Sequence, residues 1–216
     1  MLNLDIVTLI IIVANVLVSS KGLNDFSFFE KYKFNIGSVR RGEQIRMLSS
    51  GFLHVDMTHL LFNMITLYFF AGIVNVYLGT FNFLLVYFGS LLAGNLLSFY
   101  FHKEEYYYSA VGASGAVTGI IYSAILLRPD LPLNFMFIPI DIPGYVFGIG
   151  YLLYSIYGMK NRLGNIGHDA HFGGAIGGYV LTLIMSPWLL QTSLTMVLLL
   201  ALPIVLLFIM RKMGKL

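Results

Sequence analysis

Long apolar runs constrain this chain more than any other feature of its sequence. Several of them approach the roughly 20 residues that an α-helix needs to cross the hydrocarbon core of a bilayer. Of the 216 residues, 58% are hydrophobic and only 11% are charged, which is more apolar surface than a soluble domain of this size requires. The sequence therefore predicts an all-α, polytopic membrane helical bundle.

The runs predict six membrane spans and a seventh near the C-terminus. The expected spans cover about 5–18, 58–78, 81–101, 114–127, 143–157, 169–186 and 188–210. The first lacks a preceding basic region and a small-residue cleavage site, so we expect a retained span and not a signal peptide. We expect residues 1–187 to form a six-helix core, and residues 188–216 to add a transmembrane helix and a short basic tail.

Cysteine content and charge narrow the possible chemistry. The chain has no cysteine, which excludes disulfides, thiolate nucleophiles and Cys-ligated zinc. Its net charge of +3 is spread over loops and the tail. This implies contact with anionic lipid head groups and not with nucleic acid.

A serine lies among small residues at the start of the fourth span, in the order Gly112-Ala113-Ser114-Gly115, and Gly119 follows one turn later. Glycines let other backbones come close, and the first turn of a helix has unpaired N–H groups. One interpretation is a hydroxyl placed to react, and the other is a small-residue helix-packing face. Taken alone, the stretch favours the packing face.

Four polar side chains from three spans fall at one depth. Spans two, four and six run in the same direction, and at about 1.5 Å per residue Ser114, Asn63 and His171 lie roughly 21, 22 and 24 Å from the far ends of their spans. His59 lies one turn from Asn63 on the same face. Polar groups in a bilayer are costly and usually mark function, although any one of these alone could make an ordinary interhelical hydrogen bond.

This layer permits acyl transfer. His171 can accept the proton of Ser114, and the developing oxyanion can be stabilised by the Ser114 N–H, the Asn63 amide and the His59 ring. The predicted reaction is peptide-bond hydrolysis. Span four is too short to cross the bilayer alone, so we expect residues 106–112 to dip below the surface and to line a water-filled cavity.

Glycines are expected to bring spans four and six together. Gly115 and Gly119 have plausible partners on span six in Gly173, Gly174, Gly177 and Gly178. Without side chains at the seam two helices can approach closely, which a short serine hydroxyl needs if it is to meet a histidine.

Three motifs fall on spans two, four and six. They are His54-x4-His59-x3-Asn63, Gly112-Ala113-Ser114-Gly115 and Ala170-His171-Phe172-Gly173-Gly174. Together, over residues 43–178, they resemble the rhomboid intramembrane serine proteases. The resemblance implies a Ser114–His171 dyad without a third acid, oxyanion stabilisation by His59 and Asn63, and a structural role for His54.

The resemblance also implies partners and a location. We expect single-span membrane proteins as substrates, no cofactor, and a multi-pass protein of a bacterial cell membrane. Structural support is expected from Arg46 and from Gly112, Gly115, Gly119, Gly173 and Gly174. Thr118 stands where relatives often carry an aromatic that packs against the histidine, so we expect His171 to be held mainly by its glycine neighbours. Ile45 replaces the tryptophan of a family Trp-Arg pair.

The remaining polar residues are interpreted as structural. Asp169 does not share a helix face with His171, so we do not expect it to orient the imidazole. We expect His102 and His168 to be loop histidines at the water interface. No metal is predicted, because the HExxH pattern is missing and no carboxylate shares the layer. Structural interhelical bonds are expected from Asn15, Asn75 and Asn95.

The distribution of basic residues bears on how the protein is oriented in the membrane. Basic residues gather on the first loop while Arg128 stands alone on the opposite side, so the positive-inside rule would place the first loop in the cytoplasm. Bacterial rhomboids usually have the N-terminus inside, and we follow the family.

The alternative function is a non-catalytic rhomboid-like protein that binds membrane segments. A transporter is disfavoured, because the two halves lack paired broken helices.

Overall fold

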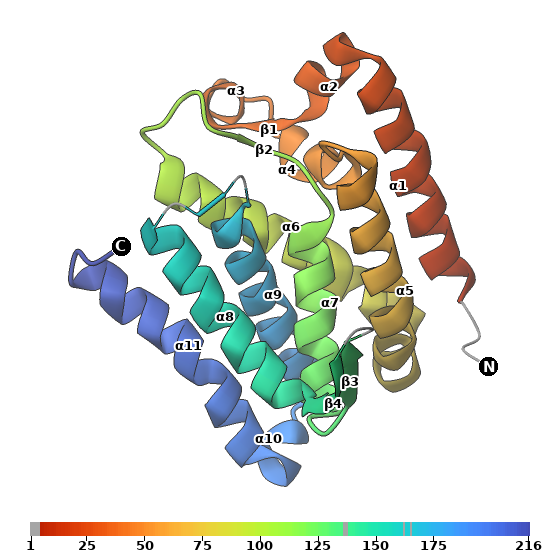
Figure 1. Cartoon of the computed structure of the whole chain (residues 1–216), viewed down its shortest axis with the longest axis vertical. Helices are drawn as coiled ribbons and strands as arrows, with labels where there is room; N and C mark the ends of the chain where they lie inside the picture. Colours follow the sequence, from red (N-terminus) through yellow and green to blue (C-terminus); the bar gives the residue numbers. More distant parts are fainter. Residues whose placement is uncertain (1–4, 136–137, 162, 165) are drawn as a thin grey trace.

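The computed structural model describes residues 5–135, 138–161, 163–164 and 166–216 and shows a helical bundle (Figure 1). Its longer helices are α1 (Ile6–Asn24), α5 (Met57–Leu78), α6 (Thr80–His102), α7 (Ser114–Leu127), α8 (Gly144–Asn161), α9 (His168–Met185) and α11 (Leu194–Lys212). By length and composition, α1, α5, α6 and α11 can each cross a membrane. The predicted polytopic helical bundle is confirmed.

The helix boundaries depart from the prediction at both ends of the chain. Helix α1 continues six residues beyond the predicted end at Val18, and in this added part the buried Ser19 hydroxyl donates to the carbonyl of Phe52 at 2.8 Å. The run 188–210 is not one helix. It divides into α10 (Leu189–Thr192) and α11, which are separated by Ser193.

The connection from α1 to α5 is compactly folded. It contains α2 (Phe26–Tyr32), β1 (Phe34–Asn35), α3 (Ile36–Arg40), α4 (Arg46–Ser49) and the 3-10 helix η1 (Ser50–Phe52), gathered at one end of the bundle in Figure 1. The buried Arg46 guanidinium joins this region. It donates to the carbonyls of Glu30 at 2.7 Å and Lys33 at 2.9 Å and pairs with Glu43 at 2.7 Å.

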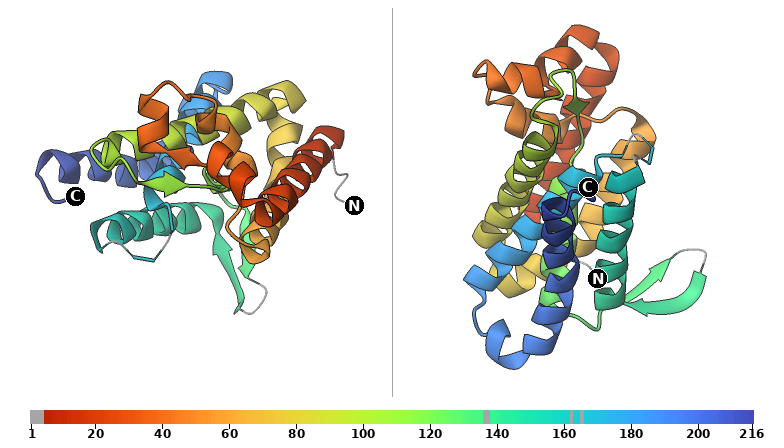
Figure 2. Two further views of the ribbon diagram at one scale, coloured as in Figure 1. Left: turned by 90° about the horizontal axis from the view of Figure 1, so that it is seen from above. Right: turned by 90° about the vertical axis from the view of Figure 1, so that its left-hand side faces the viewer.

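A β-hairpin lies between α7 and α8, where the prolines had predicted an irregular connection. Strands β3 (Pro132–Phe135) and β4 (Ile138–Pro143) pair antiparallel, and the hairpin projects from the side of the bundle (Figure 2). The prolines at positions 132 and 143 face each other at its open end. Proline is tolerated there because a strand end needs no complete ladder of N–H donors.

Helix α7 is the centre of the bundle and matches its predicted bounds residue for residue. All of its residues from Gly115 to Leu127 are buried, and α5, α6, α8 and α9 contact it. A helix that is apolar on all sides is stable when it is buried on all sides. The first residue of this helix, Ser114, is the only one of its residues that is not buried.

Glycines place α9 between α6 and α7. A β-carbon added to Gly174 or Gly178 would overlap the carbonyl groups of Gly115 and Gly119 on α7. The other two predicted partners face the opposite way: a β-carbon on Gly173 would lie 2.6 Å from the Ala93 carbonyl of α6, and one on Gly177 would lie 2.9 Å from the Cα of Ser90. The predicted close seam between spans four and six is therefore present, and a second seam joins α9 to α6.

Candidate active site

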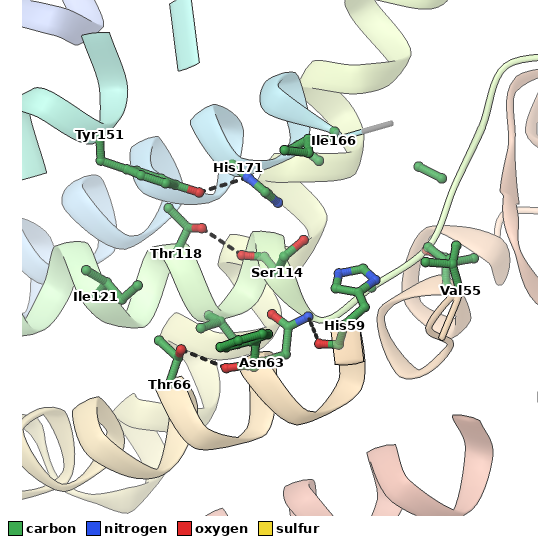
Figure 3. Close-up of a pocket in the computed structure, with 18 of the residues that line it drawn as sticks. Val55, His59, Asn63, Thr66, Ser114, Thr118, Ile121, Tyr151, Ile166 and His171 are labelled. Carbon is green, nitrogen blue, oxygen red and sulfur yellow. Dashed lines mark hydrogen bonds between the residues drawn. The ribbon is translucent and has the colours of Figure 1, made fainter. Parts of the chain in front are cut away.

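A cavity of 1320 Å³ opens into the bundle and is lined by residues of α5, α7, α8 and α9. Ser114, His171, His59 and Asn63 all line it, and Figure 3 shows their side chains around one space. The four polar residues that the sequence placed at one depth are therefore brought together.

The segment that leads into Ser114 is held at three successive points. Strand β2 (Ser109–Ala110) pairs with β1 of the first connection. The Gly112 N–H then donates to the Ser50 carbonyl at 3.0 Å, and the Ala113 N–H donates to His54 Nε2 at 3.3 Å. Ala113 is the cap residue of α7 and has no side chain that could cap it, and the Ser114 N–H has no acceptor in the described part of the chain. The Ser114 N–H is thus left without a protein partner at the start of α7.

His54 contacts both the first helix and the segment that carries Ser114. Its ring is fully buried, and because Nε2 accepts from the Ala113 N–H, the ring proton is on Nδ1, which donates to the Ser19 hydroxyl at 2.8 Å. Burial, with a smaller effect of the neighbouring His59, lowers the pKa of His54 to about 3. His54 therefore stays neutral and ties α1 to the segment that carries Ser114.

Gly112 adopts a backbone conformation that only glycine tolerates easily. Its φ is +131°, and a β-carbon there would lie 2.7 Å from the His59 ring. The glycine therefore leaves room for the His59 imidazole beside the serine.

Helix α5 supplies the two predicted oxyanion donors. Its first turn is capped by Asp56, whose carboxylate accepts from the His59 N–H at 2.7 Å. One turn later, the Asn63 amide nitrogen donates to the His59 carbonyl at 3.1 Å, and Asn63 lines the cavity with a second amide N–H that this bond leaves unused. Figure 3 shows both side chains on the Ser114 side of α5.

His171 is oriented by a residue that the sequence did not single out. Its Nδ1 lies 2.8 Å from the hydroxyl of Tyr151 on α8, and the two rings are nearly parallel, with centroids 6.2 Å apart. The other end of the imidazole points toward Ser114 (Figure 3). The prediction that glycine neighbours mainly hold His171 missed this contact, because a pairing between two helices leaves no local sequence pattern.

Ser114 and His171 share the cavity without a direct hydrogen bond in the described part of the chain. Such bonds are often long or poorly aligned until substrate binds. Thr118 does not bridge the two residues, since its hydroxyl donates to the Ser114 carbonyl at 2.7 Å.

Asp169 belongs to a different cluster from His171. Its carboxylate accepts from the Tyr108 hydroxyl at 3.3 Å and lies 3.6 Å from His102 Nε2, and the His102 ring stacks on Tyr108. Burial and the Asp169 charge raise the pKa of Tyr108, so the phenol stays protonated as the donor.

The prediction that His168 lies at the water interface is wrong, because its side chain is buried and only 3% exposed.

Metal binding has no support within the described residues, where no group of three or more His, Asp or Glu side chains is placed to hold an ion. The expected helix-to-helix amide bonds are present. Asn15 donates to Tyr87, Asn75 to Thr8, and Asn95 to Ser50.

Comparison with known proteins decides the family. The Rhomboid domain model matches residues 41–188, more than two thirds of the chain. The chain belongs to the rhomboid family. This rhomboid is 33% identical over 154 residues to YdcA of Bacillus subtilis, a match that covers 70% of this chain and 71% of the relative. It is thus a multi-pass membrane protein.

Other relatives come from both bacteria and mitochondria. The rhomboid protease GluP of Bacillus subtilis is 31% identical over 143 residues, and the mitochondrial RHOMBOID-like protein 12 of Arabidopsis thaliana is 27% identical over 182 residues. These matches cover 65% and 77% of this chain. The chain spans only 26% and 54% of the two relatives.

Proposed function

We propose that this rhomboid is an intramembrane serine endopeptidase with Ser114 as nucleophile and His171 as base. One observation carries the proposal: both side chains, together with His59 and Asn63, line a single cavity inside a membrane bundle. Nucleophile, base and oxyanion donors around one space are the requirement for acyl transfer.

The proposed reaction begins with attack of the Ser114 Oγ on a substrate carbonyl carbon, while His171 Nε2 takes the hydroxyl proton. The negative charge on the carbonyl oxygen is stabilised by the Ser114 N–H, the Asn63 amide and the His59 ring. The C–N bond then breaks as the imidazolium gives its proton to the leaving amine. Water then attacks the acyl carbon as His171 takes one of its protons, and the ester C–O bond breaks as the imidazolium returns that proton to the Ser114 Oγ.

The proposed substrates are single-span membrane proteins, cut where the helix unwinds near the bilayer surface, because a peptide bond inside a helix is shielded from attack. Their hydrolysis by this dyad needs no cofactor or metal. We place the protein in a bacterial cell membrane, with the N-terminus inside. Residues 1–187 form the proposed catalytic core, and residues 188–216 are an added helix and tail.

A serine-directed fluorophosphonate probe tests the proposal on the full chain in detergent or liposomes. We expect labelling and cleavage of a single-span substrate by wild type, and loss of both in Ser114→Ala and His171→Ala. Ser193→Ala is the matched control, because this serine lies between α10 and α11, away from the cavity. Equal labelling of wild type and Ser114→Ala would instead favour the non-catalytic role of binding membrane segments.

A further inference from the structure

The second nitrogen of the His171 imidazole has a specific partner on another helix. The Tyr151 hydroxyl of α8 lies 2.8 Å from His171 Nδ1, and both residues line the cavity. A base that receives the serine proton on Nε2 must carry its own hydrogen on Nδ1. The partner at Nδ1 therefore determines whether the correct tautomer is present.

The other candidates for this position are engaged elsewhere. The Asp169 carboxylate faces Tyr108 and His102, and Thr118 donates to the Ser114 carbonyl. Tyr151 is thus the hydrogen-bonding side chain at Nδ1 in the described part of the chain.

We propose that Tyr151 is a positioning residue, which accepts the Nδ1 hydrogen bond of His171 and so fixes the tautomer and direction of the base. The inference rests on the proposed protease function. With Nδ1–H donating to the phenol oxygen, the Nε2 lone pair is directed at Ser114, and the bond persists when the imidazolium forms. Tyr151 does not touch the substrate in this role.

Ring packing supports the same role. The Tyr151 ring is nearly parallel to that of His171, at 22°, and to that of Phe147, at 18° and 5.8 Å between centroids. The hydroxyl–Nδ1 contact joins the Tyr151 and His171 rings edge to edge and limits rotation of the imidazole about χ2, and Phe147 packs against the Tyr151 ring.

The test is Tyr151→Phe, which keeps the ring and removes only the oxygen. Loss of one neutral hydrogen bond is expected to slow fluorophosphonate labelling of Ser114 about tenfold and to lower kcat by a similar factor. KM and the unfolding temperature should stay near the wild-type values. Tyr157→Phe, on an exposed site of the same helix, is the matched control and should label at the wild-type rate.

A spectroscopic measurement tests the tautomer without any change to the site. We expect 15N NMR of the wild-type protein, assigned through His171→Ala, to show His171 protonated on Nδ1, and we expect mixed tautomers in Tyr151→Phe. Protonation on Nε2 in wild type, or labelling of Tyr151→Phe within twofold of wild type, overturns the inference. Slower cleavage with unchanged labelling also overturns it, by assigning Tyr151 to substrate entry. Failure of wild type itself to label at Ser114 would instead contradict the proposed function.

Discussion

Gly174 of α9 lies against Gly115 of α7 so closely that a β-carbon on Gly174 would overlap the Gly115 carbonyl oxygen. Both glycines lie near the candidate site in the sequence. Gly115 is next to Ser114, and Gly174 is three residues after His171. The helix separation at this contact therefore determines whether a short hydroxyl and an imidazole can share one cavity.

Gly174→Ala is expected to destabilise the protein by about 3 kcal/mol, because the added methyl group must push two backbones apart. Gly150→Ala on α8 is the matched control: nothing lies within 4 Å of its added carbon, and replacing a helical glycine should stabilise by about 0.5–1 kcal/mol. Thermal unfolding in detergent measures both. Equal stability of the two variants would mean that α7 and α9 are not tightly packed.

Gly112→Ala is expected to abolish most activity, because its β-carbon would displace the His59 ring. Gly42→Ala imposes similar strain at φ +101° but has nothing within 4 Å. Both variants should lose about 1–2 kcal/mol of stability, and only Gly112→Ala should lose protease activity. Inactivity of Gly42→Ala would show that general destabilisation, and not His59, explains the loss.

Asn63→Ala is expected to reduce kcat by about 100- to 1,000-fold, the usual effect of removing one oxyanion donor. The fold should remain intact. Asn82→Ala on α6 removes a similar amide bond to a carbonyl four residues earlier, at 2.9 Å, but outside the cavity. Kinetics with a single-span substrate distinguish the two variants. Loss of folded Asn63→Ala protein would make the residue structural.

His54 is expected to make stability depend on pH. Its pKa is about 3 in the folded protein against an ordinary 6.5, so below pH 6.5 the unfolded chain binds a proton that the folded chain excludes. Stability should therefore fall as pH decreases from 6.5 toward 3, by at most about 1.4 kcal/mol per pH unit from this group. Unfolding of Ser114→Ala protein with and without His54→Gln measures the contribution. Identical slopes between pH 6.5 and 4 would refute it.

The sequence predicted the elements best where physical signals for a boundary were local. Helix α7 begins after Gly112 and Ala113 and ends before Arg128 and Pro129, so both bounds were correct. The end of α1 was placed too early, because the apolar run stops at Val18, whereas the polar Ser19 is buried within the helix and its hydroxyl bonds to Phe52.

The break between α10 and α11 was missed because hydropathy alone does not distinguish a turn from a helix within an apolar run.

The candidate site also contains a part that the sequence predicted and a part that it could not predict. Motif spacing predicted that Ser114, His171, His59 and Asn63 would meet, since each lies at a definite depth on its helix. The partner of His171 and the burial of His168 could not be predicted, because both depend on how α8 packs beside α9.

The glycines on two sides of α9 have a mechanical consequence. Turning this helix about its own axis, or sliding it along its length, would drive its backbone into Gly115 and Gly119 on one side and into Ala93 and Gly94 on the other. The position of the His171 Cα relative to α6 and α7 is thereby fixed. Any movement of the His171 imidazole relative to α6 and α7 then has to come from its χ1 and χ2 torsions.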